Sequence, residues 1–232
     1  MSFTSIIIPS YTALHVAKVA LSSVTEIQRQ QLLSQYRPAV FSDWKPSRQA
    51  SFLAGRAAVA KWQSLFSQDA FSVPRQSDGS PRWPPCWLGS IAHCRTEAVA
   101  ILHQNIFTAN SIPLQGLGID VECISEALTL ASAADLVSYR SERVLFQCLE
   151  LGYLDPLLAI FCIKESIFKA IYPTIGKYID FLEVQIIEVD QRGHWNGKVI
   201  TNRFSHVYKE KILKGVLWEE NDKLYSVCLF SD

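Results

Sequence analysis

Two apolar segments of this chain carry charged side chains at positions where a hydrophobic core would have apolar ones. The first segment reads GLGIDVE and contains Asp120 and Glu122, and the second reads FCIKESIFKA and contains Lys164, Glu165 and Lys169. Burying a charge is costly unless it pairs with an opposite charge or binds an ion. A fold that accepts both segments must therefore provide partners for these charges.

The overall composition limits the class of protein and its partners. The chain has 232 residues, 49% of them hydrophobic, which is enough for one large domain or two small ones. With 22 basic and 22 acidic residues the formal net charge is zero, so no general field would attract nucleic acid or an anionic membrane. Any anion site must be local, and we expect no nucleic-acid partner.

The cysteines and the amino terminus indicate the compartment. Six cysteines are scattered without a C-x-x-C pair or a metal-ligand spacing, which favours core thiols. The amino terminus lacks a basic start followed by a long apolar run, and no stretch approaches the ~20 apolar residues of a membrane span. We expect a reduced, cytoplasmic monomer without a transmembrane segment.

Hydrophobic periodicity and turn residues predict an α+β chain. Helices are expected over 25–36, after Pro46 with Ser47 as cap, once or twice within 125–149, and from Pro156 to a stop at Pro173. Strands are expected within 87–94, 97–103, 115–122, 179–190, 194–200, 215–220 and 223–230. Each half thus offers a long helix and antiparallel strands, which predicts two similar α+β subdomains, 1–112 and 113–232, each with a long helix packed on a small antiparallel sheet.

The spacing of the charged residues predicts which of them share a face. Side chains alternate along a strand, so Asp120 and Glu122 point the same way, while residues four apart on a helix stack, as Glu165 and Lys169 do. If helix and strand pack together, Glu165 completes a trio of carboxylates, which with water suits Mg²⁺, and a lysine beside it suits a phosphate. Spacing alone leaves open an ordinary i,i+4 pair and a solvated strand face.

Five motifs, in this order along the chain, resemble those of the 4'-phosphopantetheinyl transferases. The likeness is greatest to their siderophore-synthetase branch, that of enterobactin synthase component D, and it covers about residues 48–170. The motifs are FLAGRAAVA, SDGSPRWP, GSIAHC, GIDVE and FCIKESIFKA. The resemblance implies the α+β fold of that family, with the active site in the cleft between its two subdomains.

The resemblance also implies roles for individual residues. It makes Asp120, Glu122 and Glu165 the Mg²⁺ ligands, and Glu165 and Lys169 the catalytic pair. Lys169 and Asp120 would lie at the pyrophosphate of coenzyme A. Around the nucleotide end and its 3'-phosphate it implies Arg48, Arg56, Arg75 and His93. From the residues alone, the simpler interpretation of Arg48 and Arg56 is a solvated helix charge, and that of His93 is a hydrogen-bonded histidine without a ligand.

Two positions depart from the family pattern. Ala92 stands where the family usually has serine, so one hydroxyl contact near the 3'-phosphate is absent. Ser80 stands where the family often has a basic residue, which leaves Arg75 or Arg82 to supply that charge. Both departures fall in the nucleotide-binding motifs, while the metal and catalytic motifs are complete.

The implied reaction is transfer of 4'-phosphopantetheine from coenzyme A to a serine of an apo carrier protein, with release of 3',5'-ADP. The branch implies acyl, aryl or peptidyl carrier domains of a siderophore-making peptide synthetase, docked on residues 123–149 with Arg140 or Arg143 against an acidic helix. Two alternatives stay open. A Mg²⁺-dependent phosphohydrolase or nuclease would turn over without a protein acceptor, and a non-catalytic binding module would use Trp83 and Trp87 as a contact patch and show no Mg²⁺ dependence.

Overall fold

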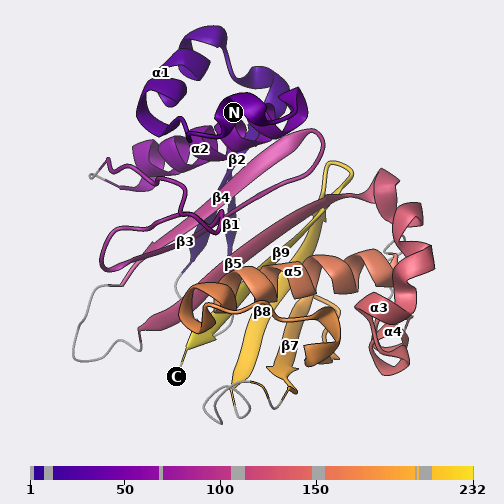
Figure 1. Ribbon diagram of the computed structural model, residues 1–232. Helices are drawn as coiled ribbons and strands as arrows, with labels where there is room; N and C mark the ends of the chain where they lie inside the picture. Colours follow the sequence, from indigo (N-terminus) through magenta and orange to yellow (C-terminus); the bar gives the residue numbers. More distant parts are fainter. Residues whose placement is uncertain are drawn as a thin grey trace. The chain divides into compact units, whose positions relative to one another are not determined.

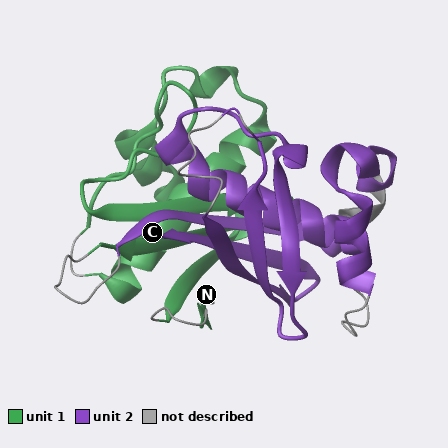
Figure 2. Cartoon of the chain, turned by 90° about the horizontal axis from the view of Figure 1, so that it is seen from below, with its two compact units in different colours: residues 1–105 green, residues 106–232 purple. Residues whose placement is uncertain are grey.

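The computed structural model describes residues 3–7, 13–67, 70–105, 113–147, 155–201, 203 and 211–231, apart from the side chains of residues 126–129. The chain divides into two compact units, residues 1–105 and 106–232 (Figure 2). The turn residues 110–112, at the predicted boundary, lie outside the described residues.

The first unit contains a four-stranded antiparallel sheet in the order β1-β2-β4-β3. Its strands are β1 (Phe3–Ile6), β2 (Leu14–Ala20), β3 (Trp87–His93) and β4 (Glu97–Gln104). The pair β3 and β4 was predicted from the sequence and is confirmed. β1 and β2 were not predicted, although β2 has a central place in the sheet between β1 and β4.

Two helices accompany this sheet, α1 (Glu26–Tyr36) and α2 (Pro46–Phe66), with short 3₁₀ turns η1 (Leu21–Ser23) and η2 (Phe41–Asp43) before them. Thr25 and Gln28 form a reciprocal capping box at the start of α1. The predicted cap at Ser47 is wrong. Lys45 is the N-cap and makes no side-chain cap bond, because Pro46 takes the first helical position, where its missing N–H costs nothing.

One face of α2 packs on the first sheet and forms a small core. Ala58, Val59 and Trp62 of the helix contact a buried surface formed by Ala17, Ala100 and Leu102 of the strands. Between α2 and β3 the chain forms the predicted proline-rich loop, with one isolated bridge between Arg75 and Pro81. The glycine of this loop, Gly79, has a φ of 97°, a conformation that other residues rarely adopt.

The second unit contains a five-stranded antiparallel sheet in the order β5-β9-β8-β7-β6. Its strands are β5 (Leu114–Cys123), β6 (Val184–Val189), β7 (His194–Val199), β8 (Ile212–Glu220) and β9 (Lys223–Ser231). The predicted hairpin turn between β8 and β9 is confirmed, since Asn221 and Asp222 have φ angles of 53° and 60°. The strand predicted to begin at residue 179 begins at Val184 instead. Asp180 caps a 3₁₀ turn, η4 (Phe181–Glu183), which precedes the strand.

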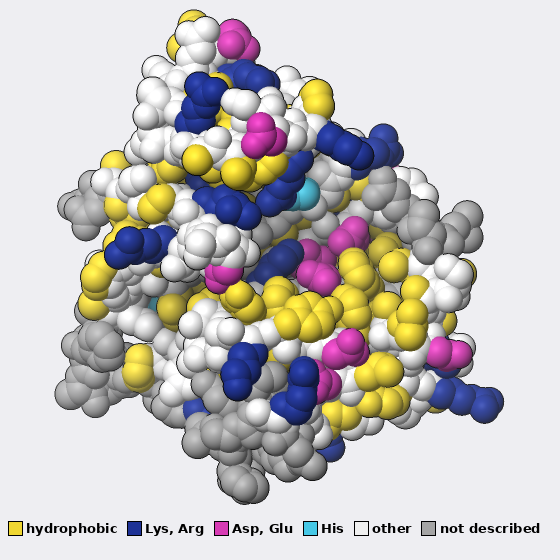
Figure 3. All heavy atoms as spheres, viewed as in Figure 1, with side chains coloured by type: hydrophobic (Ala, Val, Ile, Leu, Met, Phe, Trp, Pro, Cys, Tyr) yellow, Lys and Arg dark blue, Asp and Glu magenta, His cyan; other side chains and the backbone are white. Residues whose placement is uncertain are grey.

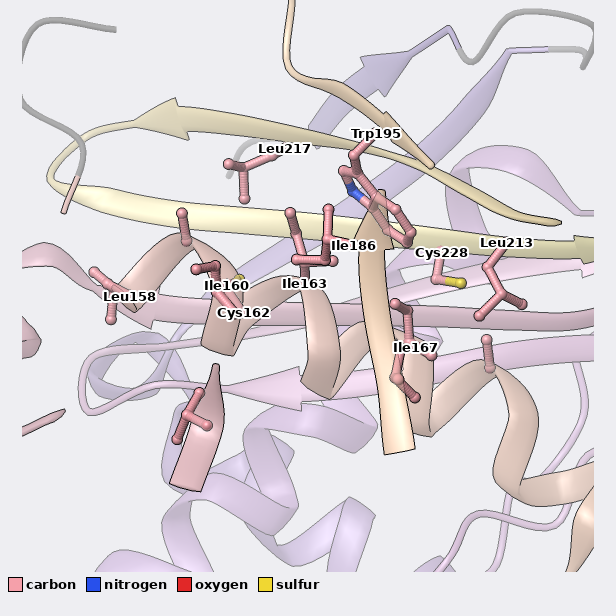
Figure 4. Close-up of a cluster of buried hydrophobic side chains, with 14 of the residues drawn as sticks. Leu158, Ile160, Cys162, Ile163, Ile167, Ile186, Trp195, Leu213, Leu217 and Cys228 are labelled. Atoms are coloured by element: carbon pink, nitrogen blue, oxygen red, sulfur yellow. The ribbon is translucent and has the colours of Figure 1, made fainter. Parts of the chain in front are cut away.

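Helix α5 (Pro156–Ile175) lies along this second sheet (Figure 1) and supplies most of its core. Figure 4 shows Ile160, Ile163 and Ile167 of the helix packed beside Trp195 and Leu217 of the strands. Asp155 caps the helix by accepting hydrogen bonds from the N–H groups of Leu157 and Leu158, as predicted from the sequence.

The predicted stop of α5 at Pro173 is wrong by two residues. The helix continues to Ile175 and ends at Gly176, whose φ of 64° forms the left-handed cap. In the last turn a proline removes one N–H bond, and its fixed φ is compatible with the helix, so the glycine rather than the proline decides the end.

The segment between β5 and α5 forms short helices: η3 (Ile124–Ala133), α3 (Ala134–Val137) and α4 (Arg140–Gln147). The prediction of one or two helices here is confirmed, although the first is 3₁₀. Among the described cysteines, four are buried and Cys86 is exposed, so the prediction of a core thiol is wrong for Cys86. None of the described helices has the length and apolar character required for a membrane span.

Candidate functional site

Two glycines of β5 allow α5 to approach the strand closely. A Cβ atom on Gly116 would lie 2.1 Å from the carbonyl oxygen of Ala170, and one on Gly118 would lie 1.9 Å from that of Ser166. Any larger residue would push the helix away from the sheet. The alternation of the strand puts Asp120 and Glu122 on the same face as these glycines, and therefore on the side where the helix carries Glu165 and Lys169.

Asp120 and Lys169 form an ion pair across this contact. The Nζ of Lys169 donates to Oδ1 of Asp120 at 2.5 Å, and the two side chains are 25% and 5% exposed. The other carboxylate oxygen of Asp120, Oδ2, is buried and has no hydrogen-bond partner in the part of the chain that the structure describes. A buried carboxylate oxygen without a partner is costly, so a ligand or ion is the natural complement of this position.

Glu165 shares the electrostatic environment of this pair. Burial raises the pKa of Glu165, Lys169 lowers it, and Asp120 raises it again, with a net upward shift. Burial lowers the pKa of Lys169, but Asp120 and Glu165 outweigh that effect and raise it. The two carboxylates therefore act on one ammonium group, which remains charged at neutral pH.

The buried thiol of Cys162 lies beneath the same acids. Its pKa is well above the ordinary value because of burial, with further contributions from Asp120 and Glu122. Asp120, Glu122 and Glu165 are nevertheless not arranged as a ready-made metal site, since no group of three His, Cys, Asp or Glu side chains that could hold a metal ion occurs among the described residues. In this arrangement Lys169 balances the charge of Asp120.

Lys164, one residue before Glu165, has a different environment. Its ammonium group is 1% exposed and donates to Glu142 Oε2 at 2.9 Å and to the carbonyl oxygens of Val137 and Phe181 at 3.0 and 2.9 Å. Glu142 also accepts hydrogen bonds from the backbone N–H groups of Tyr139 and Ile186. All three donors of the lysine are thus used within the fold.

Glu142 is a residue of this network that the sequence analysis missed. It belongs to α4 and is fully buried, together with Phe146 one turn later. That i,i+4 pair on one helix face is the only local signal that the glutamate points inward.

In the first unit, the predicted nucleotide-binding residues form a basic cluster. Arg48 Nη1 lies 3.2 Å from His93 Nε2, and Arg56 is only 5% exposed. Burial lowers the pKa of Arg56 to about 10, with an opposing contribution from Tyr36 and further lowering by Arg48 and Arg75. The structure therefore brings Arg48, Arg56, Arg75 and His93 together, as the sequence predicted.

The arginines of this cluster lack acidic partners. None of the three forms an ion pair with a carboxylate within the described ranges, and the Nε atoms of Arg56 and Arg75 are buried without a hydrogen-bond partner. Arg75 lies in the proline-rich loop, where a Cβ on Gly79 would come within 2.8 Å of its Nη2. Uncompensated, part-buried guanidinium groups are suited to a polyanion such as a phosphate group.

The two departures from the family pattern have structural consequences. Ser80 donates its hydroxyl to Asp78 Oδ1 at 2.7 Å and so serves the turn of its own loop. Ala92 is buried in β3, next to His93. Of the two arginines that could replace the missing charge, Arg75 interacts electrostatically with Arg48 and Arg56, whereas Arg82 is exposed.

A cavity lies in each of the two units. A cavity of 50 Å³ lies in the second unit and is lined by Glu165, Phe168 and Tyr178, among others. A cavity of 560 Å³ in the first unit, along α1 and α2, is lined by none of the predicted site residues. Figure 3 shows hydrophobic side chains gathered over the region of α5, with acidic side chains at their border.

Comparison with known families gives two matches that together span most of the chain. Residues 16–103 match the 4'-phosphopantetheinyl transferase N-terminal domain, and residues 116–227 match the 4'-phosphopantetheinyl transferase superfamily. The first match contains the arginine cluster, and the second contains Asp120, Glu165 and Lys169.

Several curated proteins are similar to this chain. Enterobactin synthase component D of Salmonella typhimurium is 33% identical over 53% of this chain and 48% of its own length, so the match spans about half of that relative. The protein of the same name from Escherichia coli K12 is 28% identical over 76% of this chain and 74% of its own. The 4'-phosphopantetheinyl transferase Npt of Nocardia iowensis is 28% identical over 60% of this chain and 59% of its own length.

A solved structure also matches part of the chain. It is a holo-(acyl-carrier-protein) synthase from Bacillus anthracis in complex with coenzyme A (3',5'-ADP), with a TM-score of 0.40 and 21% identity. The match covers 51% of this chain and 97% of that one.

Proposed function

We propose that this chain, which belongs to the 4'-phosphopantetheinyl transferase superfamily, transfers 4'-phosphopantetheine from coenzyme A to a serine of an apo carrier protein and releases 3',5'-ADP. The observation that carries the proposal is the pairing of Asp120 with Lys169 beside Glu165, with one oxygen of Asp120 buried and unpartnered. In this arrangement Glu165 can accept a proton, Lys169 can bind a phosphate group, and Oδ2 of Asp120 can bind a metal ion.

The arginine cluster of the first unit would bind the nucleotide end of coenzyme A. Arg48, Arg56, Arg75 and His93 offer several donors and no carboxylate, which suits the 3'-phosphate. The cation of Lys169 in the second unit would bind the pyrophosphate. Coenzyme A carries negative charge at its 3'-phosphate and at its pyrophosphate, which suits the charge of each cluster taken by itself.

Mg²⁺ is the metal ion that this acid cluster would hold. The buried Oδ2 of Asp120, which has no hydrogen-bond partner among the described residues, would be one ligand, and Glu122 and Glu165 would add others. Mg²⁺ usually binds one or two protein carboxylates and fills its remaining positions with water and substrate phosphate, so it does not require three ligands arranged in advance. When bound, it would neutralise charge on the pyrophosphate and help to hold it in place.

The side chains of α5 would then carry out the transfer. The serine Oγ of the carrier attacks the β-phosphorus of coenzyme A, a phosphorus–oxygen bond forms, and the bond to 3',5'-ADP breaks. Glu165 accepts the serine proton directly or through a water. A cation bound at Glu165 would lower the pKa of its carboxylate, which favours the route through a water. Lys169 donates to the pyrophosphate oxygens as charge grows on the departing 3',5'-ADP.

The surface next to Glu165 would accept the uncharged part of the substrate. Phe168 lies 5.5 Å from Tyr178 and 5.2 Å from Tyr172 between ring centroids, and Phe168, Tyr178 and Glu165 line the 50 Å³ cavity. The pantetheine arm is joined to the phosphorus that reacts, so it must leave along the nearest surface. An aromatic surface offers that arm apolar contact.

The carrier would dock on the short helices that follow β5. Leu136 and Val144 are 70% and 49% exposed, which gives an apolar contact within 124–147, while 148 and 149 lie outside the described residues. Arg143 is held by Asp135 and Ser138, so the exposed Arg140 is better placed to meet an acidic partner.

The similarity to enterobactin synthase component D supports carrier domains of a siderophore-making peptide synthetase as the acceptors. The free cysteines among the described residues support a protein at work in a reducing compartment such as the cytoplasm.

Mass spectrometry of an apo carrier incubated with this protein, coenzyme A and Mg²⁺ tests the proposal. We expect a mass gain of one phosphopantetheine, no gain without Mg²⁺, and no gain with Asp120→Ala or Glu165→Ala, both of which should keep the wild-type circular dichroism spectrum. Cleavage of coenzyme A without a carrier would indicate a phosphohydrolase instead. Binding without any turnover would indicate a non-catalytic module.

A further inference from the structure

Aromatic rings, rather than carboxylates, contact the arginines of the first unit. The guanidinium carbons of Arg48 and Arg75 lie 5.4 and 5.6 Å from the centre of the Trp44 ring. That of Arg56 lies 4.7 Å from the Phe52 ring and 5.9 Å from the Tyr36 ring. Each of the three cations is therefore within the ~6 Å at which the face of an aromatic ring attracts a cation.

Trp44 is itself held firmly by its neighbours. Its ring meets that of Phe52 edge to face at 5.4 Å and that of Phe41 at 5.6 Å. Its carbonyl oxygen, like that of Phe41, accepts a hydrogen bond from Nε2 of Gln49 at 3.1 Å. Because Gln49 and Arg48 are adjacent on α2, the ring is fixed relative to the helix that carries the first arginine.

The two arginines above Trp44 need such support because they repel each other. Burial and the charge of Arg75 both disfavour the charged form of Arg48 and lower its pKa. A carboxylate between them would remove the repulsion, but it would also cancel the charge that an anion requires. An aromatic face attracts both cations and adds no net negative charge, so the cluster stays positive.

We propose that Trp44 is a positioning residue that holds Arg48 and Arg75 together for the 3'-phosphate of coenzyme A. The inference rests on the proposed function, because it takes coenzyme A as the ligand of the arginine cluster. Trp44 acts through the two arginines and touches neither the reacting phosphorus nor the acceptor serine. Its removal should therefore change recognition of one phosphate group and leave the chemical step intact.

The test compares coenzyme A with dephospho-coenzyme A, which differ only in the 3'-phosphate. Isothermal titration calorimetry on the full chain, without a carrier, should show that Trp44→Leu weakens coenzyme A about tenfold, as expected for losing two contacts of ~0.5–1 kcal/mol each. Binding of dephospho-coenzyme A should change by less than about twofold, and Trp44→Phe, which keeps a ring, should recover most of the loss. In transfer assays Trp44→Leu should raise KM for coenzyme A and leave kcat unchanged.

Phe41→Leu is the matched control. Phe41 packs against Trp44 and Phe52 in the same cluster but has no contact with an arginine among the described residues. It should lower the thermal midpoint to a similar extent while keeping the preference for coenzyme A.

Two results would overturn the inference: a Trp44→Leu variant that keeps the wild-type preference, or one that weakens both ligands equally. A wild-type protein that binds both ligands equally well would also overturn it, since there would be no recognition of the 3'-phosphate to support. Absence of transfer to a carrier by the wild type is a separate result, which would overturn the proposed function.

Discussion

Lys164 and Lys169 lie five residues apart on α5, and each forms an ion pair with a carboxylate, but the two pairs differ in how completely they are satisfied. Lys164 is 1% exposed, and it and Glu142 hydrogen-bond to four backbone groups as well as to each other. Lys169 is 25% exposed, and Asp120 has one oxygen without a partner among the described residues.

The difference separates a charge that is fully used within the fold from one that we propose is functional. A buried pair whose donors and acceptors are all used has nothing left to offer a substrate, and its partners come from α3, α4, η4 and β6. A pair with an unused buried oxygen and an accessible ammonium group retains the capacity to bind. Both lysines belong to the motif FCIKESIFKA, so the motif combines a residue that holds the fold with a residue that we place in the chemistry.

The largest effect on stability should follow from Lys164→Met. Removing one partner of a buried ion pair leaves an unpaired charge on Glu142, and such a loss typically costs about 3–5 kcal/mol. Urea denaturation followed by circular dichroism measures the change. The double variant Lys164→Met with Glu142→Leu should recover part of the loss, because it leaves no isolated charge. A loss below about 1 kcal/mol in the single variant would remove the structural role assigned to this pair.

A smaller effect on stability, but a large effect on rate, should follow from Lys169→Met. This substitution removes a donor to charge that grows in the transition state, and such a contact is commonly worth about 3 kcal/mol, or ~100-fold in kcat. Steady-state kinetics with an apo carrier at saturating Mg²⁺ measure it. The unfolding free energy should fall by less than in Lys164→Met, because the Lys169 side chain is 25% exposed. If Lys169→Met raised only the KM for coenzyme A, the lysine would be a binding residue and not a catalytic one.

The smallest effect is expected for a third pair, Arg143 with Asp135, which calibrates the other two. Its carboxylate is 92% exposed, and it lies at 3.2 Å from the arginine. Asp135→Ala should change the unfolding free energy by less than about 1 kcal/mol, as is usual for exposed pairs. The same urea experiment measures it. A loss as large as that of Lys164→Met would mean that burial is not what distinguishes these pairs.

Much of the fold could be predicted from local patterns. The strands β3, β4, β5, β7, β8 and β9 and the helices α1, α2 and α5 lie where periodicity and turn residues indicated them. The errors have local causes. β1 and β2 were missed although Pro9 and Ser10 stand between them in the sequence, and they obtain their partners from β4 and from each other. Two helix ends were predicted wrongly because of a proline. Pro46, and not a residue after Ser47, takes the first position of α2, and Pro173 lies within the last turn of α5 without ending it.

The sequence alone predicted which residues carry chemistry, and it determined which of them share an element. The pleat of β5 and the 3.6-residue turn of α5 place Asp120, Glu122, Glu165 and Lys169 on two defined faces, because these periods follow from backbone geometry. The resemblance of five ordered motifs led to the superfamily, which the family matches confirm. The roles of the individual site residues stay predictions.

Only the tertiary structure decided which charge pairs with which. Glu142 reaches Lys164 across 22 residues, through helices whose directions depend on how they pack on α5, and no local period encodes that contact. Trp44 meets Arg75 because η2, α2 and the proline-rich loop fold onto one cluster. Pairing energies fall steeply with distance and rise with burial, and both quantities exist only after distant segments have packed together.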